Sequence, residues 1–244
     1  MKLLHCSDWH ADHRTSGVDR FDDVAEAVAQ TVKTAREEKV DLYLFTGDLC
    51  DPDDVPRALK AVGLAIQVAI ELASDGIESW WLRGNHCLIE NGENRSVLTP
   101  LSALGSPLVK VFDTEYEETL PGRKVTERAR TAILLPYPSA SCAYDAAAFV
   151  RSIVSGKDSD VALVAGHLQV EGATPGDETT EMARGRDVFF PFEACDPNWL
   201  LLAGHYHQAQ VFERHGRKLH VPGSLVRLNH GEEKSEPRYT IWEI

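Results

Sequence analysis

Residue types that bind metal ions recur at five places in this chain, each time after a run of apolar residues. The five motifs are Asp8-Trp9-His10, Gly47-Asp48, Gly84-Asn85-His86, Gly166-His167 and Gly204-His205-Tyr206-His207. They supply the candidate side chains Asp8, His10, Asp48, Asn85, His86, His167, His205 and His207. Such carboxylate, amide and imidazole donors suit Mn²⁺, Fe²⁺ or Zn²⁺ better than Mg²⁺ or Ca²⁺. About seven ligands hold two divalent ions that share one carboxylate, and such a pair can activate water to hydrolyse a phosphoester.

Strands must bring these motifs together. The first apolar run, Leu3 to Cys6, predicts a strand, and side chains two apart on a strand share a face. We therefore expect Leu4, Cys6 and Asp8 on one face. Open α/β sheets collect their ligands beyond the carboxyl ends of the strands. All five motifs should therefore meet at one such edge.

Two helices are predicted between the first three strands. Residues 21–38 carry apolar side chains at three- and four-residue steps, with acidic residues in the first turn. Residues 55–74 form the second helix, with Pro56 suited to its first turn. Its apolar positions nearly encircle it, which indicates burial on more than one side. Deep packing against the sheet is one explanation, and a subunit interface is the other.

Shorter elements follow, and they complete a single α/β domain over residues 1–244. A helix is expected at 145–155, and irregular segments at 12–19 and 172–186. Residues 91–105 should form a loop and a short helix. Strands are expected at 41–46, 78–83, 109–112, 115–120, 130–135, 160–165, 199–203, 210–214, 218–221 and 239–242.

Composition excludes some classes of protein. The formal net charge of -13 opposes tight, unaided binding of DNA phosphates. The five scattered cysteines contain no C-x-x-C pair, which indicates reduced thiols and a cytoplasmic location. No apolar run approaches the roughly 18 residues of a membrane span, and the first residues do not form a secretory signal.

In order and spacing, the five motifs resemble the signature blocks of calcineurin-like metallophosphoesterases. The resemblance implies a four-layer α/β/β/α sandwich with two metal ions at the strand ends. It assigns Asp48 as the bridging ligand, and His86 as the residue that contacts the substrate phosphate and protonates the leaving oxygen. Histidine titrates near neutrality, which suits that role. The implied ligand sets are Asp8, His10 and His207 for one ion, and Asn85, His167 and His205 for the other.

A narrower resemblance points to the SbcD-type DNA repair nucleases. It rests on residues 1–10, 20–23, 40–41, 47–51, 222–227 and 231–233. It implies DNA ends or single strands as substrate, an SMC-like ATPase as partner, and a homodimer formed near residues 55–74. The sequence departs from that pattern because Asp51 stands where relatives often have histidine, and Cys87 where aspartate is common. The segment that would bind the ATPase, and a capping domain, are expected to be absent after Ile244.

These observations favour a binuclear phosphodiesterase that uses Mn²⁺ and acts as a DNA nuclease, with Fe²⁺ or Zn²⁺ as alternative ions. Two other functions stay open. One is the same chemistry on cyclic nucleotides or phosphomonoesters, which the acidic charge favours. The other is a non-catalytic binding scaffold, which the complete set of ligand residues and His86 argue against.

Overall fold

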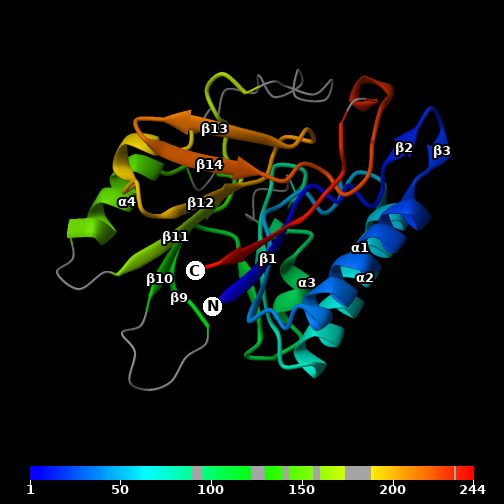
Figure 1. Cartoon of the computed structure of the whole chain (residues 1–244). Coiled ribbons are helices and arrows are strands. Elements are labelled where there is room, and N and C mark those ends of the chain that lie inside the picture. Colours follow the sequence, from blue (N-terminus) through cyan, green and yellow to red (C-terminus); the bar gives the residue numbers. More distant parts are fainter. Residues whose placement is uncertain (90–94, 122–129, 140–142, 156–159, 174–187, 234) are drawn as a thin grey trace.

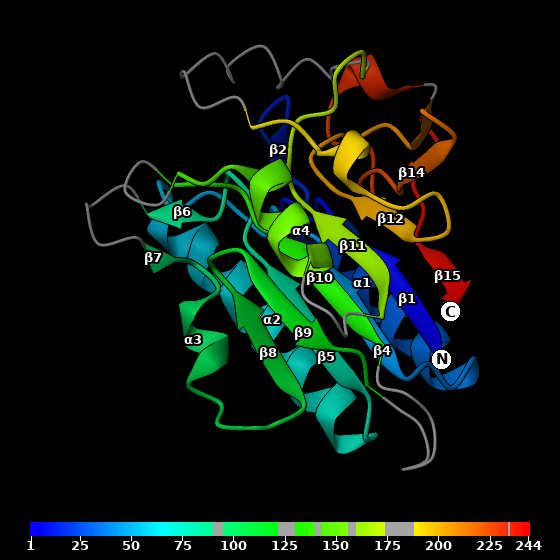
Figure 2. The ribbon, with the colours of Figure 1, turned by 90° about the vertical axis from the view of Figure 1, so that its left-hand side faces the viewer.

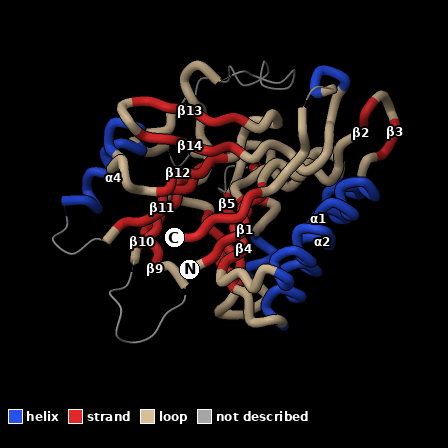
Figure 3. The backbone as a smooth tube through the Cα atoms, in the orientation of Figure 1, coloured by secondary structure: helices blue, strands red, loops and turns tan. Residues whose placement is uncertain are grey.

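The computed structural model describes residues 1–89, 95–121, 130–139, 143–155, 160–173, 188–233 and 235–244. Two sheets pack face to face, and helices cover their outer faces (Figure 1). Figure 3 shows the strands in the middle of the molecule, with the long helices outside. This is the expected four-layer α/β/β/α sandwich.

The first sheet has four parallel strands and one antiparallel edge strand. Its outer face carries the helices α1 (Phe21–Glu37) and α2 (Val55–Ser74), with the short α3 (Thr99–Ser102) beside α2. In spatial order the strands are β15 (Thr240–Glu243), β1 (Lys2–Cys6), β4 (Leu42–Phe45), β5 (Glu78–Leu82) and β8 (Val109–Phe112).

The second sheet has six strands, with a parallel centre and antiparallel edges. Helix α4 (Ala146–Ser155) packs on its outer face (Figure 2). The strands are β13 (Gln210–Arg214), β14 (Arg217–Val221), β12 (Leu200–Ala203), β11 (Val161–Gly166), β10 (Thr131–Leu135) and β9 (Tyr116–Thr119).

Strand alternation explains how one chain fills three apolar layers. In β1, Leu4 faces α1 and α2 while Leu3 faces the second sheet. In β4, Tyr43 faces the helices and Leu42 faces the second sheet. Because successive side chains point to opposite faces, a continuous apolar run makes a strand that is buried on both sides.

The sequence predicted that Asp8 shares a strand face with Leu4 and Cys6, and the reasoning behind this prediction was wrong. Strand β1 ends at Cys6, so alternation does not extend to Asp8. Asp8 instead has a φ of 52°, in the left-handed region. The backbone therefore turns at Asp8, and this turn, not strand alternation, sets the direction of the Asp8 side chain.

Helix α2 has both predicted ends but not the predicted burial. Asp54 caps it, accepting a hydrogen bond from the Arg57 amide at 3.2 Å. Leu59 and Ile70 are 66% and 50% exposed, so burial on more than one side was wrong. The helix packs through small residues instead. Its buried positions are Ala58, Ala61, Ala65, Val68, Ala69 and Leu72.

Two short hairpins were not predicted. Residues 12–19 contain β2 (Arg14–Thr15) and β3 (Val18–Asp19), joined by Ser16 and Gly17 with φ of 49° and 84°. Two successive positive φ values are typical of the turns that join hairpin strands. The other hairpin pairs β6 (Leu88–Ile89) with β7 (Arg95–Ser96).

Three further expectations concern an irregular segment, the cysteines and membrane spans. The irregular segment at 172–186 falls mostly outside the described residues. In the described part of the chain, four free cysteines are buried, and no helix has both the length and the apolarity to cross a membrane.

Candidate metal centre

The eight candidate side chains all follow the carboxyl ends of parallel strands, from β1, β4 and β5 in one sheet and β11 and β12 in the other. Backbone hydrogen bonds join the connecting loops. The Asp8 amide donates to the Gly47 carbonyl at 2.9 Å, and the Gly204 amide donates to the Gly166 carbonyl at 3.0 Å. The His205 amide reaches both carboxylate oxygens of Asp8 at 3.1 Å, which ties one sheet to the other.

Asp8, His10 and His207 form one buried group, whose donor atoms lie within 4.8 Å of one another. The Nε2 atoms of His10 and His207 are 3.0 Å apart. Burial lowers the pKa of His10 well below the ordinary histidine value, so its ring is neutral. Two imidazole nitrogens held this close need a proton or a metal ion between them, and Asp8 supplies the third donor that a metal site needs.

Asp48, His167 and His205 form a second buried group by the same criterion. The Asn85 amide oxygen belongs to it as well, 3.0 Å from His167 Nε2 and 2.9 Å from His205 Nδ1. His167 Nδ1 donates to the Thr46 carbonyl at 2.6 Å, so in the neutral form of this ring the lone pair is on Nε2. Two imidazoles, a carboxylate and an amide oxygen thus converge, which is a donor set that fits a divalent transition metal.

Asp48, a member of the second group, also faces the first. Its Oδ2 is 3.0 Å from His167 Nε2 and 3.8 Å from His10 Nε2. Burial alone would raise the pKa of Asp48, but the imidazoles of His167 and His86 outweigh it and hold that pKa well below its usual range. Burial raises the pKa of Asp8 to about 6, with His167 opposing the rise. Of these two carboxylates, Asp48 is therefore the one that ionises more readily.

His86 lies beside the two groups and belongs to neither. Its ring is 4.9 Å from the His10 ring, and its side chain is 25% exposed. The His86 amide donates to Asp48 Oδ1 at 2.9 Å. Its Nδ1 lies 2.7 Å from Asp51 Oδ1. Because a carboxylate only accepts hydrogen bonds, Nδ1 carries a proton, and Nε2 is the nitrogen that could exchange one with a substrate.

The backbone is strained where the candidate ligands lie. Asp8, His10, Asp48 and His205 have φ of 52°, 42°, 60° and 84°, in a region that non-glycine residues rarely adopt. Such strain persists only where the surroundings enforce it, and it gathers at functional sites. Four of the candidate ligands share it, so left-handed backbone, and not strand alternation, sets the direction of these side chains.

A buried arginine braces the second group. Arg83 is 1% exposed, and its Nη2 donates to the Tyr137 carbonyl at 2.8 Å. The Tyr137 ring lies 6.0 Å from the His205 ring and 6.4 Å from the His167 ring. Arg83 thereby connects the end of β5 to the residues that follow β10.

Sequence reasoning missed the residues that support the candidate ligands. Arg83 stands next to a motif, so proximity alone could have suggested it, whereas Asp51 was noticed only as a departure from the SbcD pattern. Thr46 acts through its carbonyl, which no residue type reveals. Glu232, whose Oε1 lies 2.8 Å from His207 Nδ1, was noticed only within a segment that resembles SbcD-type nucleases.

Gly84 provides a direct test of this geometry. A methyl group there would lie 2.1 Å from Asp48 Oδ1, so Gly84→Ala must displace that carboxylate. Disturbing the support of a ligand typically lowers metal affinity about 10–100-fold, and we expect at least this loss by calorimetric titration with Mn²⁺. Gly63→Ala is the matched control, since no atom lies within 4 Å of its methyl. It should leave metal affinity unchanged and stabilise α2 by roughly 0.5–1 kcal/mol.

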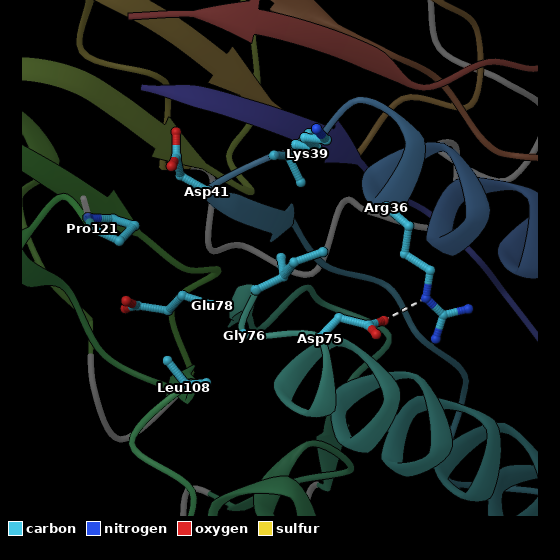
Figure 4. A pocket seen from close by; sticks show the side chains of 10 residues that line it. Arg36, Lys39, Asp41, Asp75, Gly76, Glu78, Leu108 and Pro121 are labelled. Carbon is cyan, nitrogen blue, oxygen red and sulfur yellow. Dashed lines mark hydrogen bonds and ion pairs between the residues drawn. The ribbon is translucent and has the colours of Figure 1, made fainter. Parts of the chain in front are cut away.

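A cavity of about 590 Å³ lies away from this centre, where β4 and β5 begin. Figure 4 shows Arg36 directed at Asp75, with which it forms an ion pair. Asp41 and Glu78 also line it. None of the eight candidate side chains belongs to this lining.

The fold and the two donor groups fit a metal-dependent hydrolase, and comparison with known proteins identifies the family. A profile of the calcineurin-like phosphoesterases matches residues 1–209, so the chain belongs to that family of metal-dependent hydrolases. The chain is similar to the SbcD component of the nuclease SbcCD of Escherichia coli, with 24% identity over 95% of this chain and 62% of that protein.

Two further proteins are similar to this chain, one in sequence and one in fold. The DNA double-strand break repair protein Mre11 of Methanopyrus kandleri is 27% identical over 97% of this chain and 51% of its own length. The chain thus spans about half to two thirds of these relatives. A dimetal phosphatase from Danio rerio shares the fold, with a TM-score of 0.60, 13% identity, and coverage of 99% of this chain and 91% of its own.

Proposed function

We propose that this protein is a binuclear metal-dependent phosphodiesterase. The observation that carries the proposal is the pair of buried donor groups with Asp48 between them. Asp8, His10 and His207 would hold one ion. Asn85, His167 and His205 would hold the other, with Asp48 shared by both.

When bound, two divalent ions polarise a phosphoryl oxygen and lower the pKa of water. The chain's own residues do the rest. Burial keeps the rings of His10 and His205 neutral, as ligands must be. His86 would contact the phosphate and give a proton to the leaving oxygen. We propose Mn²⁺ as the ion, since the mixed nitrogen and oxygen donors suit it, and Fe²⁺ or Zn²⁺ would also fit.

For the substrate, we propose DNA, cleaved at ends or in single strands. The two relatives described above carry names from DNA processing, one a nuclease component and the other a break repair protein. The segment around Arg20 supports the same assignment. Its guanidinium donates to the Arg227 carbonyl at 2.9 Å, which joins two of the sequence segments that resemble SbcD-type nucleases.

The second candidate is a phosphodiesterase or phosphatase for small molecules. The net charge of -13 favours it, because a polyanion is repelled and a small substrate is repelled less. A binding scaffold without catalysis is the third, and a complete donor set together with His86 argues against it.

One panel separates the three functions. The protein is incubated with Mn²⁺ and, separately, linear duplex DNA, circular single-stranded DNA, a cyclic nucleotide and an aryl phosphodiester. Cleavage of DNA supports the nuclease. Turnover of the cyclic nucleotide without DNA cleavage supports the second candidate. Binding of two metal ions without turnover of any substrate supports the scaffold.

DNA binding should be weak and steeply dependent on salt. Each phosphate contact adds about 0.9 to the slope of log affinity against log salt. A splayed single strand can bring one phosphodiester to the centre without docking a rigid helix, so we expect cleavage of single strands and flaps over intact duplex. Activity with Mn²⁺ at low salt should fade by physiological salt. Nanomolar binding of blunt duplex at physiological salt would contradict this prediction.

The exposed side of α2 is our candidate for a homodimer interface, and an SMC-like ATPase is a candidate partner by analogy with SbcD-type nucleases. Val55, Leu59 and Ile70 are 61%, 66% and 50% exposed. Light scattering at micromolar concentration should give twice the 27.0 kDa chain mass. Leu59→Glu should return the monomer, whereas Val211→Glu, at a 55% exposed position on β13, should not. A monomeric wild-type protein would exclude the dimer.

A further inference from the structure

A buried glutamate lies behind one of the candidate ligands. Glu232, in the short helix η3 (His230–Glu232), is 1% exposed. Its Oε1 lies 2.8 Å from His207 Nδ1. It belongs to the part of the chain that follows the family match at residues 1–209. A carboxylate this deeply buried is costly unless donors satisfy it.

Three donors converge on that carboxylate. Besides His207, the Asn229 amide group donates to Oε1 at 3.0 Å, and the Leu228 backbone amide donates to Oε2 at 2.7 Å. Both oxygens therefore face donors. A glutamine in this place would turn its amide group toward one of those donors in either orientation. The pocket is thus suited to a carboxylate and not to its neutral isostere.

The position of the proton on His207 follows from this contact. Since a carboxylate only accepts, Nδ1 of His207 must donate, and in a neutral ring Nε2 then has the lone pair. Nε2 is the atom that lies 3.0 Å from His10 Nε2. The backbone of His207 is held as well, because the Ser224 amide donates to the His207 carbonyl at 3.0 Å.

We propose that Glu232 is a positioning residue, which holds His207 in the tautomer and orientation that present Nε2 to the ion beside Asp8 and His10. The inference rests on the proposed metal centre and deepens it. A carboxylate behind a histidine ligand fixes the ring and makes it a better donor, and its loss typically lowers metal affinity about 10–100-fold.

Titration of the metal-free full chain with Mn²⁺ tests the proposal. Wild type should bind two ions. Glu232→Gln should weaken one of them about 10–100-fold and leave the other unchanged. Glu233→Gln, at the exposed neighbouring position, should match wild type. A folded Glu232→Gln protein with wild-type affinity for both ions would overturn the proposal.

His207→Ala separates this inference from the metal centre itself. If that variant binds both ions like wild type, the assigned centre is wrong, and the role of Glu232 is wrong with it. If it loses one ion while Glu232→Gln keeps both at wild-type affinity, only the role of Glu232 is wrong.

A measurement on the wild type does not depend on any variant folding. Long-range nitrogen–proton correlation NMR of the Zn²⁺-loaded protein reports which imidazole nitrogen is protonated. We expect a proton on Nδ1 of His207 and metal coordination at Nε2. Coordination through Nδ1 would overturn the proposal.

Discussion

Asp48→Ala is expected to lose both metal ions and all measurable turnover. Asp48 Oδ2 lies 3.0 Å from His167 Nε2 and 3.8 Å from His10 Nε2, one nitrogen from each donor group. Removing it takes an oxygen from both groups and the negative charge that offsets the repulsion between two cations. Metal ions contribute several kcal/mol of transition-state stabilisation, so the rate should fall by at least about 10³-fold.

Elemental analysis of the purified variant, together with a phosphodiesterase assay in excess Mn²⁺, measures both effects. Asp48→Asn distinguishes charge from shape, since it keeps an oxygen but removes the charge, and it should also lose metal. Asp53→Ala, at an exposed position in the same loop, is the matched control. Two tightly bound ions in Asp48→Ala would refute the bridging role.

Much of this centre could be predicted because its residues follow strands directly. A parallel strand that is buried on both faces is an apolar run, and the residue after it lies at the edge of the sheet. The ends of α2 were predictable too. Asp54 and Pro56 mark its start, and Gly76, with a φ of 75°, follows its end.

The direction of individual side chains could not be predicted. Asp8 and His205 depend on left-handed backbone that the sequence pattern does not encode, since only a small share of aspartate and histidine residues adopts it, although both are enriched there relative to other non-glycine residues. The burial of α2 failed for a related reason. Apolar residues on all sides of a helix show how much of its surface could be buried. Which side is buried depends on the elements that pack against the helix. In α2 it is the side that carries the alanines.

The residues that support the candidate ligands could not be predicted, because they are distant in sequence or act through backbone carbonyls. Glu232 reaches His207 across 25 residues from a segment with no periodic pattern. Arg83 donates to the backbone of Tyr137, 54 residues away, and a carbonyl acceptor has no signature in the sequence. Ligands can be recognised by residue type, whereas the residues that orient them are defined by the fold.

His86→Ala is expected to keep both ions and lose catalysis. His86 lies outside both donor groups, so its removal should leave the metal content unchanged. A general acid contributes roughly 10²–10⁴-fold to the rate, and we expect a loss in that range for a DNA substrate. Asp51→Asn should cause a smaller loss, because Asp51 holds Nδ1 at 2.7 Å and acts only through the ring. His215→Ala, at an exposed turn, is the control.

The leaving group decides whether His86 acts as an acid. An alkoxide leaving from deoxyribose is strongly basic and needs a proton, whereas a nitrophenolate leaves without one. Since the benefit of general acid catalysis grows with the basicity of the leaving group, His86→Ala should be impaired much less on a nitrophenyl phosphodiester than on DNA. Equal losses on the two substrates would mean that His86 binds the phosphate and transfers no proton. Loss of metal together with activity would make His86 a ligand, against its place outside both donor groups and its hydrogen bond to Asp51.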